Sequence, residues 1–333
     1  MAEIHVLNVG QGDCTILHSN SDRTTMFDIC GGNIEQGELV EETIAKSLAK
    51  INFQMCKHPT NPIRFLKEEM GLSSVFRFIL SHPDMDHLDG FNNLIENMSV
   101  VNFWDSGVRK EKPDFKTESK YKEEDWDRYV KVRDEKESGV NVVSPKAGAI
   151  NKYYNQDDKG GGGDFIYIYA PDSGLVDEAN DSENAQAVHD ASYVIVYRSA
   201  GGRILLPGDA HDKAWDYVLK HYGKELKECE FMLAPHHGRD SNRSWTFLDK
   251  IKPKFSVLGC AASEHLAYNV WDSRKLKKIT QNQAGNIAIY PDSDGLNIYV
   301  ENKKFAHSLG GDTNKEDEYG NYYLTYIQKS TNY

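Results

Sequence analysis

The chain has 333 residues, and its 39 lysines and arginines face 51 aspartates and glutamates, giving a formal charge of −12 at pH 7. This acidic balance argues against tight non-specific binding to the outside of a nucleic-acid duplex, although bound divalent ions can reverse the potential locally. The five cysteines have no paired spacing, which favours a reduced protein over a disulfide framework. No leader pattern and no membrane-length apolar run is present, so we expect a cytoplasmic protein that needs no membrane.

The N-terminal part predicts a β-rich segment followed by helices. The spacing of apolar residues indicates strands over 4–9, 14–17 and 25–29 and helices over 38–51 and 63–70. The first two strands are joined by Gly10-Gln11-Gly12-Asp13. Such glycines either let the backbone pass close to another group or simply make a tight turn, and this stretch alone favours neither.

A strand predicted over 75–80 leads into SHPDMDHLDG, residues 81–90, which has the highest density of metal-ligand residue types in the chain. Side chains two apart in an extended segment share a face, so His82 and Asp84 are able to converge on one ion while Asp86 and His87 point at a second. Asp86 also stands where an N-cap is expected for a helix over 88–98. One such residue is typical of a polar turn, but four within six residues favour a metal site.

The composition changes over 105–164, which we interpret as a charged insertion within a single domain, residues 1–333. A solvated helix is expected around 121–137. The run Gly160–Gly163 has no following Lys-Ser or Lys-Thr, so a linker is favoured over a phosphate-binding loop. After the insertion the pattern indicates strands over 165–170, 192–198, 203–206 and 231–234, an acidic loop over 172–190, and a helix over 211–222.

Two of these later strands also end in ligand-type residues. One leads into Pro207-Gly208-Asp209 and the other into Pro235-His236-His237-Gly238. An isolated Gly-Asp is usually only a turn, and an isolated His pair is usually only surface. Three strands in one chain that end in such residues match what a metal site at one sheet edge requires.

Taken together and in order, five motifs resemble the metallo-β-lactamase superfamily: NVGQGD, FDICGG, SHPDMDHLDG, LLPGDA and APHHG. They are most similar to the hydrolase domain of the competence DNA-uptake protein ComEC and its free-standing relatives, in which the superfamily's H-x-H-x-D-H signature takes the form H-x-D-x-D-H. The resemblance covers most of the chain outside the insertion. It implies an α/β fold, the αββα sandwich, in which two mixed β-sheets flanked by helices carry the metals at one edge.

The resemblance also implies two divalent metal ions and a ligand set. It places His82 and Asp84 on the first ion, Asp86 and His87 on the second, and Asp209 between the two. Either His236 or His237 completes the second ion. We prefer His236 as the ligand, which leaves His237 as a proton donor or substrate contact and makes Asp86, Asp209 and His237 the catalytic candidates.

Five further residues have open roles. Asp13 matches the acid of the family's first motif and is expected to face a metal or to support a ligand. His189 and Asp190 lie where the close relatives carry a different pattern, so a metal ligand and a satisfied loop residue are both possible. Arg239 stands where the relatives usually have Ser, and with Arg243 it either holds a phosphate as a bidentate donor or is an ordinary surface residue.

The chemistry follows from the ligand types. Two divalent cations a few Å apart lower the pKa of water from ~16 towards ~7 and clamp the oxygens of an ester, which predicts a hydrolase. The carboxylate of Asp84, in place of an imidazole, shifts the preference towards Mn²⁺, with Zn²⁺ still possible. Phosphodiester hydrolysis fits best, because a dianionic transition state gains most from two cations and nearby arginines.

The leading hypothesis is therefore a two-metal phosphodiesterase or nuclease that acts on single-stranded DNA or a nucleotide-like phosphodiester. The basic cluster Arg274, Lys275, Lys277 and Lys278 supports it, unless this cluster is only a solvated helix face. The alternative is a lactone, thioester or other carboxylic-ester hydrolase on the same metals, which the acidic charge mildly favours. A catalytically silent binding module is a third possibility, disfavoured because every ligand position holds a competent residue.

Overall fold

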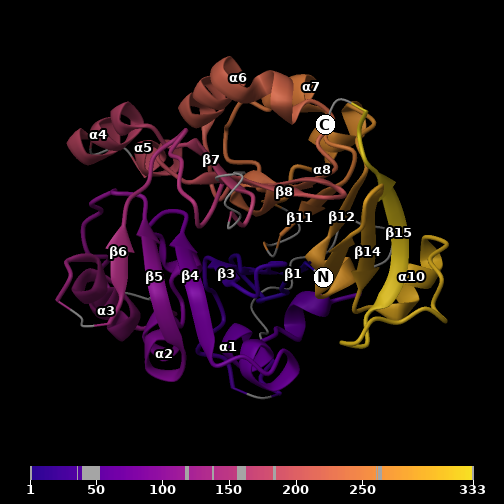
Figure 1. Ribbon diagram of the computed structural model, residues 1–333, viewed down its shortest axis with the longest axis horizontal. Helices are drawn as coiled ribbons and strands as arrows, with labels where there is room; N and C mark the ends of the chain where they lie inside the picture. Colours follow the sequence, from indigo (N-terminus) through magenta and orange to yellow (C-terminus); the bar gives the residue numbers. More distant parts are fainter. Residues whose placement is uncertain are drawn as a thin grey trace.

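The computed structural model describes residues 2–35, 37–39, 53–116, 120–136, 139–155, 163–182, 185–259, 261 and 265–331. Two β-sheets lie face to face, and helices cover their outer faces (Figure 1). The predicted α/β class and αββα arrangement of two mixed sheets are confirmed. Among the described helices, none combines the length and the apolar character needed to cross a membrane.

The first sheet contains both chain ends of the described structure. Its strand order is β15-β14-β13-β1-β2-β3-β4-β5-β6. The strands from β3 to β6 pair in parallel and the others antiparallel. The strand bounds are β1 (Glu3–Val6), β2 (Thr15–His18), β3 (Thr24–Phe27), β4 (Ser74–Leu80), β5 (Ser99–Asp105), β6 (Asn141–Val143), β13 (Ile287–Pro291), β14 (Gly295–Val300) and β15 (Tyr322–Gln328).

The second sheet is built from the middle of the chain. Its order is β12-β11-β10-β9-β8-β7, with parallel pairing from β9 to β12 and antiparallel pairing of β8 with both of its neighbours. The strand bounds are β7 (Ile166–Ala170), β8 (Val194–Ser199), β9 (Gly202–Leu206), β10 (Phe231–Leu233), β11 (Ser256–Leu258) and β12 (Lys278–Thr280).

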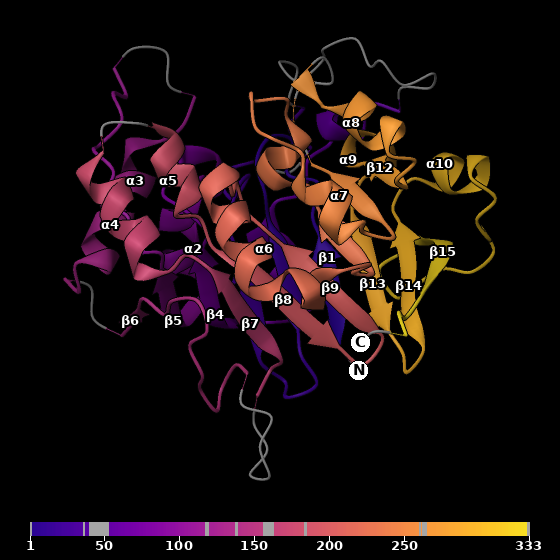
Figure 2. The same cartoon turned by 90° about the horizontal axis from the view of Figure 1, so that it is seen from above.

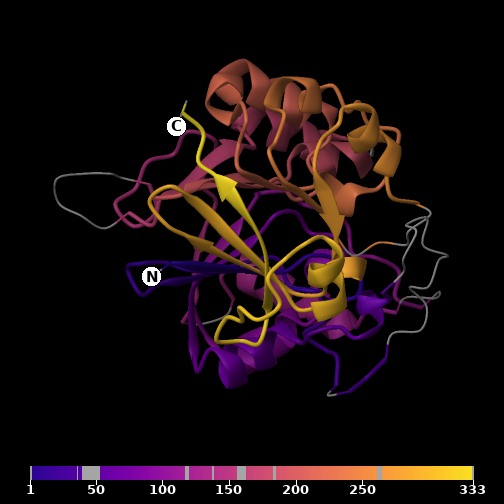
Figure 3. The same ribbon diagram turned by 90° about the vertical axis from the view of Figure 1, so that its right-hand side faces the viewer.

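The helices form two outer layers (Figure 1), and Figure 2 looks down onto the layer that covers the second sheet. Those beside the first sheet are α1 (Pro62–Arg64), α2 (Phe91–Asn97) and α3 (Glu123–Arg133). Those on the side of the second sheet are α4 (Ser173–Asp181), α5 (Ala185–Asp190), α6 (Asp212–Leu226), α7 (Phe247–Ile251) and α8 (Tyr268–Ser273). Two further short helices follow, α9 (Gln281–Ala284) and α10 (Lys303–Ser308), the second of which lies beside β15 (Figure 3).

The layers follow from the alternation of side chains along each strand. In β4, Phe78 points outward and its ring centroid lies 5.3 Å from that of Phe91 on α2, whereas Ile79 points inward to the core between the sheets. That central core also contains Leu206 and Leu233 of the second sheet. Because successive residues of a strand face opposite sides, strands covered on both faces are largely apolar, as the run before residue 81 is apart from Arg77.

Two sequence expectations about helices are wrong. Residues 172–190, expected to be an acidic loop, contain α4 and α5. The side chain of Asp172 accepts a hydrogen bond from the Leu175 amide and so caps α4, and the apolar side chains of the two helices pack together under the acidic surface. Asp86 is not the N-cap of α2, because Gly90 takes that position and the carboxylate of Asp125 accepts hydrogen bonds from amides at the start of the helix.

The segment expected to be an insertion, residues 105–164, is joined to the first sheet. The helix predicted around 121–137 is present as α3, and β6 adds an edge strand beside β5. Asp164, at the end of the segment, forms buried ion pairs with Arg23 and Arg77. Residues 137, 160–162 and most of the helix predicted over 38–51 lie outside the described residues.

Candidate metal centre

The ligand-type residues predicted from the sequence gather at one edge of the two sheets. The stretch 81–90 begins directly after β4 and contains a short helical turn, Met85–His87. Asp209 follows β9, and His237 lies in the turn Pro235–Gly238 after β10. Since β9 and β10 pair in parallel, their carboxyl ends share one edge of the second sheet. The end of β4 meets them there from the first sheet, because Nε2 of His82 lies 3.7 Å from Oδ2 of Asp209.

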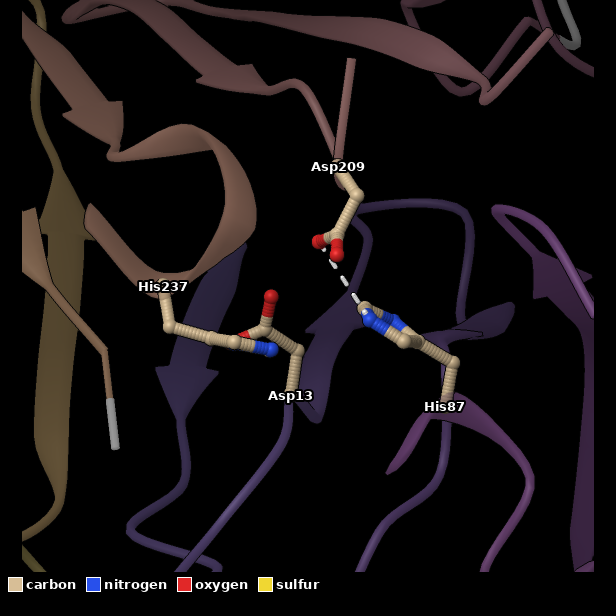
Figure 4. Close-up of side chains that lie close together, drawn as sticks. All are labelled: Asp13, His87, Asp209 and His237. Carbon is tan, nitrogen blue, oxygen red and sulfur yellow. Dashed lines mark ion pairs between the residues drawn. The ribbon is translucent and has the colours of Figure 1, made fainter. Parts of the chain in front are cut away.

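Four buried residues form what we term the inner group: Asp13, His87, Asp209 and His237. Each offers one ligand atom, and these atoms all lie within 4.8 Å of one another. Figure 4 shows the four side chains converging from different segments of the chain. Nε2 of His87 lies 3.3 Å from Oδ1 of Asp209, and Nδ1 of His237 lies 3.0 Å from Oδ1 of Asp13. Asp86 adjoins the group, with its Oδ2 3.2 Å from Nε2 of His237.

Three residues form a second cluster, the outer group: His82, Asp84 and His189. Oδ2 of Asp84 lies 3.6 Å from Nε2 of His82 and 3.3 Å from Nε2 of His189. The other oxygen of Asp84 is bound by Lys110, whose Nζ lies 2.6 Å away. Lys110 belongs to the segment after β5, so part of the expected insertion contacts the cluster directly.

Asp209 lies between the two groups. Its Oδ1 is 3.3 Å from Nε2 of His87 in the inner group, and its Oδ2 is 3.7 Å from Nε2 of His82 in the outer group. A carboxylate with one oxygen towards each cluster is the arrangement that joins two neighbouring cations.

The residues present fit divalent cations. Within the described part of the chain, the buried Nε2 atoms of His82 and His87 and Oδ1 of Asp209 have no hydrogen-bond partner. Buried polar atoms are nearly always satisfied, so atoms left unpaired at one point indicate a missing ligand. Imidazole nitrogens and carboxylate oxygens together are donors that both Zn²⁺ and Mn²⁺ accept.

Supporting residues hold the imidazoles in place. Asp28 accepts a hydrogen bond from the Ser81 amide at 2.6 Å, and its other oxygen lies 2.8 Å from Nδ1 of His87. Nδ1 of His82 lies 3.0 Å from the hydroxyl of Ser81. A carboxylate behind a ligand histidine fixes the ring's tautomer and leaves Nε2 free for the cation. Asp28 was not among the site residues predicted from the sequence, although it lies within the motif FDICGG.

The electrostatics of the site favour charged carboxylates. Burial by itself raises the pKa of Asp209, but the surrounding imidazoles, first that of His236, hold it well below its usual value. Burial likewise raises the pKa of Asp84, which His82 and a hydrogen bond from His189 lower to a greater extent. For His87, burial lowers the pKa, but Asp209 and Asp28 raise it well above its usual value, so a cation that bound there would displace a proton.

Two of the predicted site residues, Asp190 and Arg243, lie in different settings from these. Asp190 accepts hydrogen bonds from the Lys213 and Ala214 amides, at 2.8 and 3.2 Å, and so holds the start of α6. Arg243 is buried and donates to the carbonyl oxygen of Ala210 at 2.8 Å. Another of its nitrogens lies 2.9 Å from Nδ1 of His236.

Of the remaining predicted residues, His236 and Arg239 lie at or near the two groups. Nε2 of His236 is 3.5 Å from Oδ2 of Asp209, but His237, not His236, is a member of the inner group. Arg239 lines a cavity beside Asp86. In the basic cluster, Arg274 and Lys278 form ion pairs with Asp249 and Asp272.

Neither a protein-family model nor a curated protein matches this chain. Among solved structures, one similar chain is a metallo hydrolase from the hyperthermophilic archaeon Ignicoccus hospitalis, with 11% identity and a TM-score of 0.46 over 87% of this chain and 100% of that chain. Another is a diphosphatase from the PhnP family, with 9% identity and a TM-score of 0.34 over 77% of this chain and 85% of that chain.

Proposed function

We propose that this protein is a two-metal phosphodiesterase or nuclease that acts on single-stranded DNA or a nucleotide-like phosphodiester. The observation that carries the proposal is the pair of adjacent ligand groups with Asp209 between them. Two bound cations, Zn²⁺ or Mn²⁺, would activate water and stabilise the charge that develops on the attacked and leaving oxygens. The motif series quoted above is the basis for proposing a ComEC-like member of the metallo-β-lactamase superfamily.

The two groups define the proposed ligands. His82, Asp84 and His189 hold one cation, and His87, His237, Asp86 and Asp13 surround the other. This assignment gives His189 a ligand role that the sequence left open. It also makes His237 the metal ligand and His236 the substrate contact, which is the reverse of the roles first expected for them.

The exchange rests on the contact between Arg243 and His236. A guanidinium N–H only donates, so Nδ1 of His236, 2.9 Å from Arg243, must accept. The proton of the neutral ring is then on Nε2, which has no lone pair for a cation. A second proton, on Nδ1, would remove the acceptor of this contact, so the ring that binds Arg243 is neutral. We therefore propose that His236 donates its Nε2 proton in a hydrogen bond to a substrate oxygen, and that Arg243 is a positioning residue rather than a phosphate ligand.

Two positively charged side chains at the rim of the site favour an anionic substrate over a neutral lactone or thioester. Lys110 reaches Asp84 in the outer group, and Arg239 lines the cavity beside the inner group. Positive side chains near two metal ions stabilise a phosphoryl transition state more than a carboxylic one, because the former carries more negative charge.

Metal analysis and diester cleavage test the proposal together. We expect two divalent ions per chain and hydrolysis of bis-p-nitrophenyl phosphate, with both lost in Asp84→Ala and Asp209→Ala. Asp240→Ala, at an exposed carboxylate outside both groups, is the matched control and should retain ions and activity. Two ions with cleavage of a lactone or thioester but of no diester would replace this function by the carboxylic-ester alternative, and a metal-free protein would refute both.

A further inference from the structure

A cavity of about 250 Å³ opens beside the inner group. Its walls include Gln11, Asp86, Tyr121, His237, Arg239 and His265. Asp86 and His237 belong to the metal-facing side, whereas Arg239 and His265 approach from the loops that follow β10 and β11. Tyr121 comes from the segment between β5 and α3. The cavity therefore adjoins the proposed reaction centre but is lined largely by residues that no metal role requires.

Arg239 is the unusual member of this wall. Among the described residues, no carboxylate lies within ion-pair distance of its half-buried guanidinium. Every other arginine of the chain except the interior Arg243 forms such a pair, as Arg274 does with Asp249 at 2.8 Å. A guanidinium with free donors that faces a cavity is suited to bind a planar or tetrahedral oxyanion in a bidentate manner.

Backbone hydrogen bonds hold the segment that carries Arg239 in a fixed position. Arg239 pairs with Leu266 in an antiparallel bridge, and the Asp240 amide donates to the carbonyl oxygen of His265 at 2.7 Å. The Ala267 amide also donates to the carbonyl oxygen of Gly238, at 2.9 Å. Arg239 and His265 are thus presented from two paired segments, so the cavity wall is ordered before a ligand arrives.

Among the described residues that line the cavity, Asp86 carries the negative charge, and its carboxylate already faces two imidazoles. Asp86 turns its Oδ2 to Nε2 of His237 at 3.2 Å, and its Oδ1 lies 3.9 Å from Nε2 of His87. Its charge is therefore directed to the inner group, and the Arg239 side of the cavity remains positive. A ligand that spans the cavity meets the imidazole of His237 at one end and the guanidinium of Arg239 at the other.

The volume limits the ligand. Sites that enclose a drug-sized molecule measure about 300–1,000 Å³, and this cavity is smaller. It has room for one phosphate with the sugar attached to it. Tyr121 supplies an aromatic wall against which a sugar or base edge can pack.

We propose that this cavity is a subsite for a terminal phosphate monoester of the substrate, bound by Arg239. The inference rests on the proposed phosphodiesterase function and deepens it, because a subsite for a chain end favours nucleotides and the phosphorylated ends of oligonucleotides over internal positions of a strand. No residue of either metal group is reassigned by this proposal.

Calorimetric titration of the metal-loaded protein with thymidine 5′-monophosphate and with thymidine tests the subsite directly. We expect the monophosphate to bind at least about tenfold more tightly than the nucleoside, since hydrogen bonds to a charged group carry that much. Arg239→Gln should lose this preference, and Arg239→Lys should recover part of it through its charge alone. Arg274→Gln is the matched control, because Arg274 is occupied by Asp249, and it should bind as the unaltered protein does.

Turnover of two dinucleotides completes the test. The 5′-phosphorylated dinucleotide should be cleaved with at least about tenfold higher kcat/KM than the unphosphorylated one, and Arg239→Gln should remove the difference. Equal binding of monophosphate by Arg239→Gln and the unaltered protein, with metal content equal in both, would overturn the subsite. Absence of cleavage of both dinucleotides by the unaltered protein would instead overturn the phosphodiesterase function, while the titration still decides the subsite.

Discussion

The substitution Asp28→Asn tests whether the histidine ligands depend on the carboxylate behind them. One oxygen of Asp28 accepts from the Ser81 amide at 2.6 Å, and the other faces Nδ1 of His87 at 2.8 Å. In the variant, the oxygen of the new side-chain amide must keep the bond to Ser81, so the NH₂ group turns to His87. It then donates to Nδ1, which moves the ring proton to Nε2 and removes the lone pair that faces the inner group.

The expected loss follows from this change of tautomer. Removing a carboxylate behind a ligand histidine typically costs about 10–100-fold in metal affinity, which corresponds to about 1.4–2.7 kcal/mol. Asparagine is the suitable replacement because Asp28 has a φ of 54°, a left-handed conformation that asparagine tolerates better than most residues. The backbone is therefore retained, and the effect reports on the side-chain amide alone.

The assay is a competition titration at constant pH, in which a chelator of known affinity competes with the protein for Zn²⁺ or Mn²⁺. Asp172→Asn is the matched control, because asparagine caps α4 as well as aspartate does. It should leave both affinity and melting temperature unchanged. A metal affinity of Asp28→Asn within about threefold of the unaltered protein, in a variant that keeps its circular dichroism spectrum, would refute the reasoning about the tautomer.

Two further predictions concern stability. Gly12 has a φ of 107°, and a Cβ there would lie 2.1 Å from the carbonyl oxygen of Asp86, so Gly12→Ala should cost roughly 3 kcal/mol or more in urea unfolding. Gly71→Ala, with a φ of 66° and open space around it, should cost only about 1 kcal/mol, and equal losses would contradict the close approach. Burial raises the pKa of Glu230, but hydrogen bonds from Arg203 and Ser330 outweigh it, so the folded-state pKa lies below the usual value. The unfolded chain then binds more protons at acidic pH, so this stabilisation is complete above the unfolded pKa of about 4.5 and is lost as the pH falls through the folded pKa. Glu230→Gln should be less stable near pH 7 and lose less stability on acidification, and unfolding curves with the same pH dependence would contradict this.

Much of the sheet and ligand arrangement was predictable because its signals are local. Apolar runs that end in ligand-type residues indicate strands whose ends meet, and β4, β9 and β10 each carry such residues. The αββα class was implied by the family resemblance that the motifs carry when taken in order. Less local features were not predictable, such as α4 and α5, whose apolar stripe is narrow and lies within an acidic composition.

Helix caps and supporting carboxylates were also not predictable from the sequence alone. The start of α2 is capped by Asp125, a residue 35 positions from Gly90 along the chain, so no local pattern pairs them. Asp28 supports His87 across 59 positions, and Lys110 reaches Asp84 across 26. Each of these contacts depends on how separate elements pack, and a sequence pattern reports only neighbours within a turn or a strand.

The sequence by itself determined which residue types are available for metal chemistry and which strands carry them to the edge of the sheets. Only the tertiary structure decided how they are divided: His189 with His82 and Asp84, and His237 with His87 and Asp209. The adjacent histidines 236 and 237 have the same local sequence signal. Their environments differ because Arg243 contacts one ring and Asp13 the other, and both partners come from outside the motif.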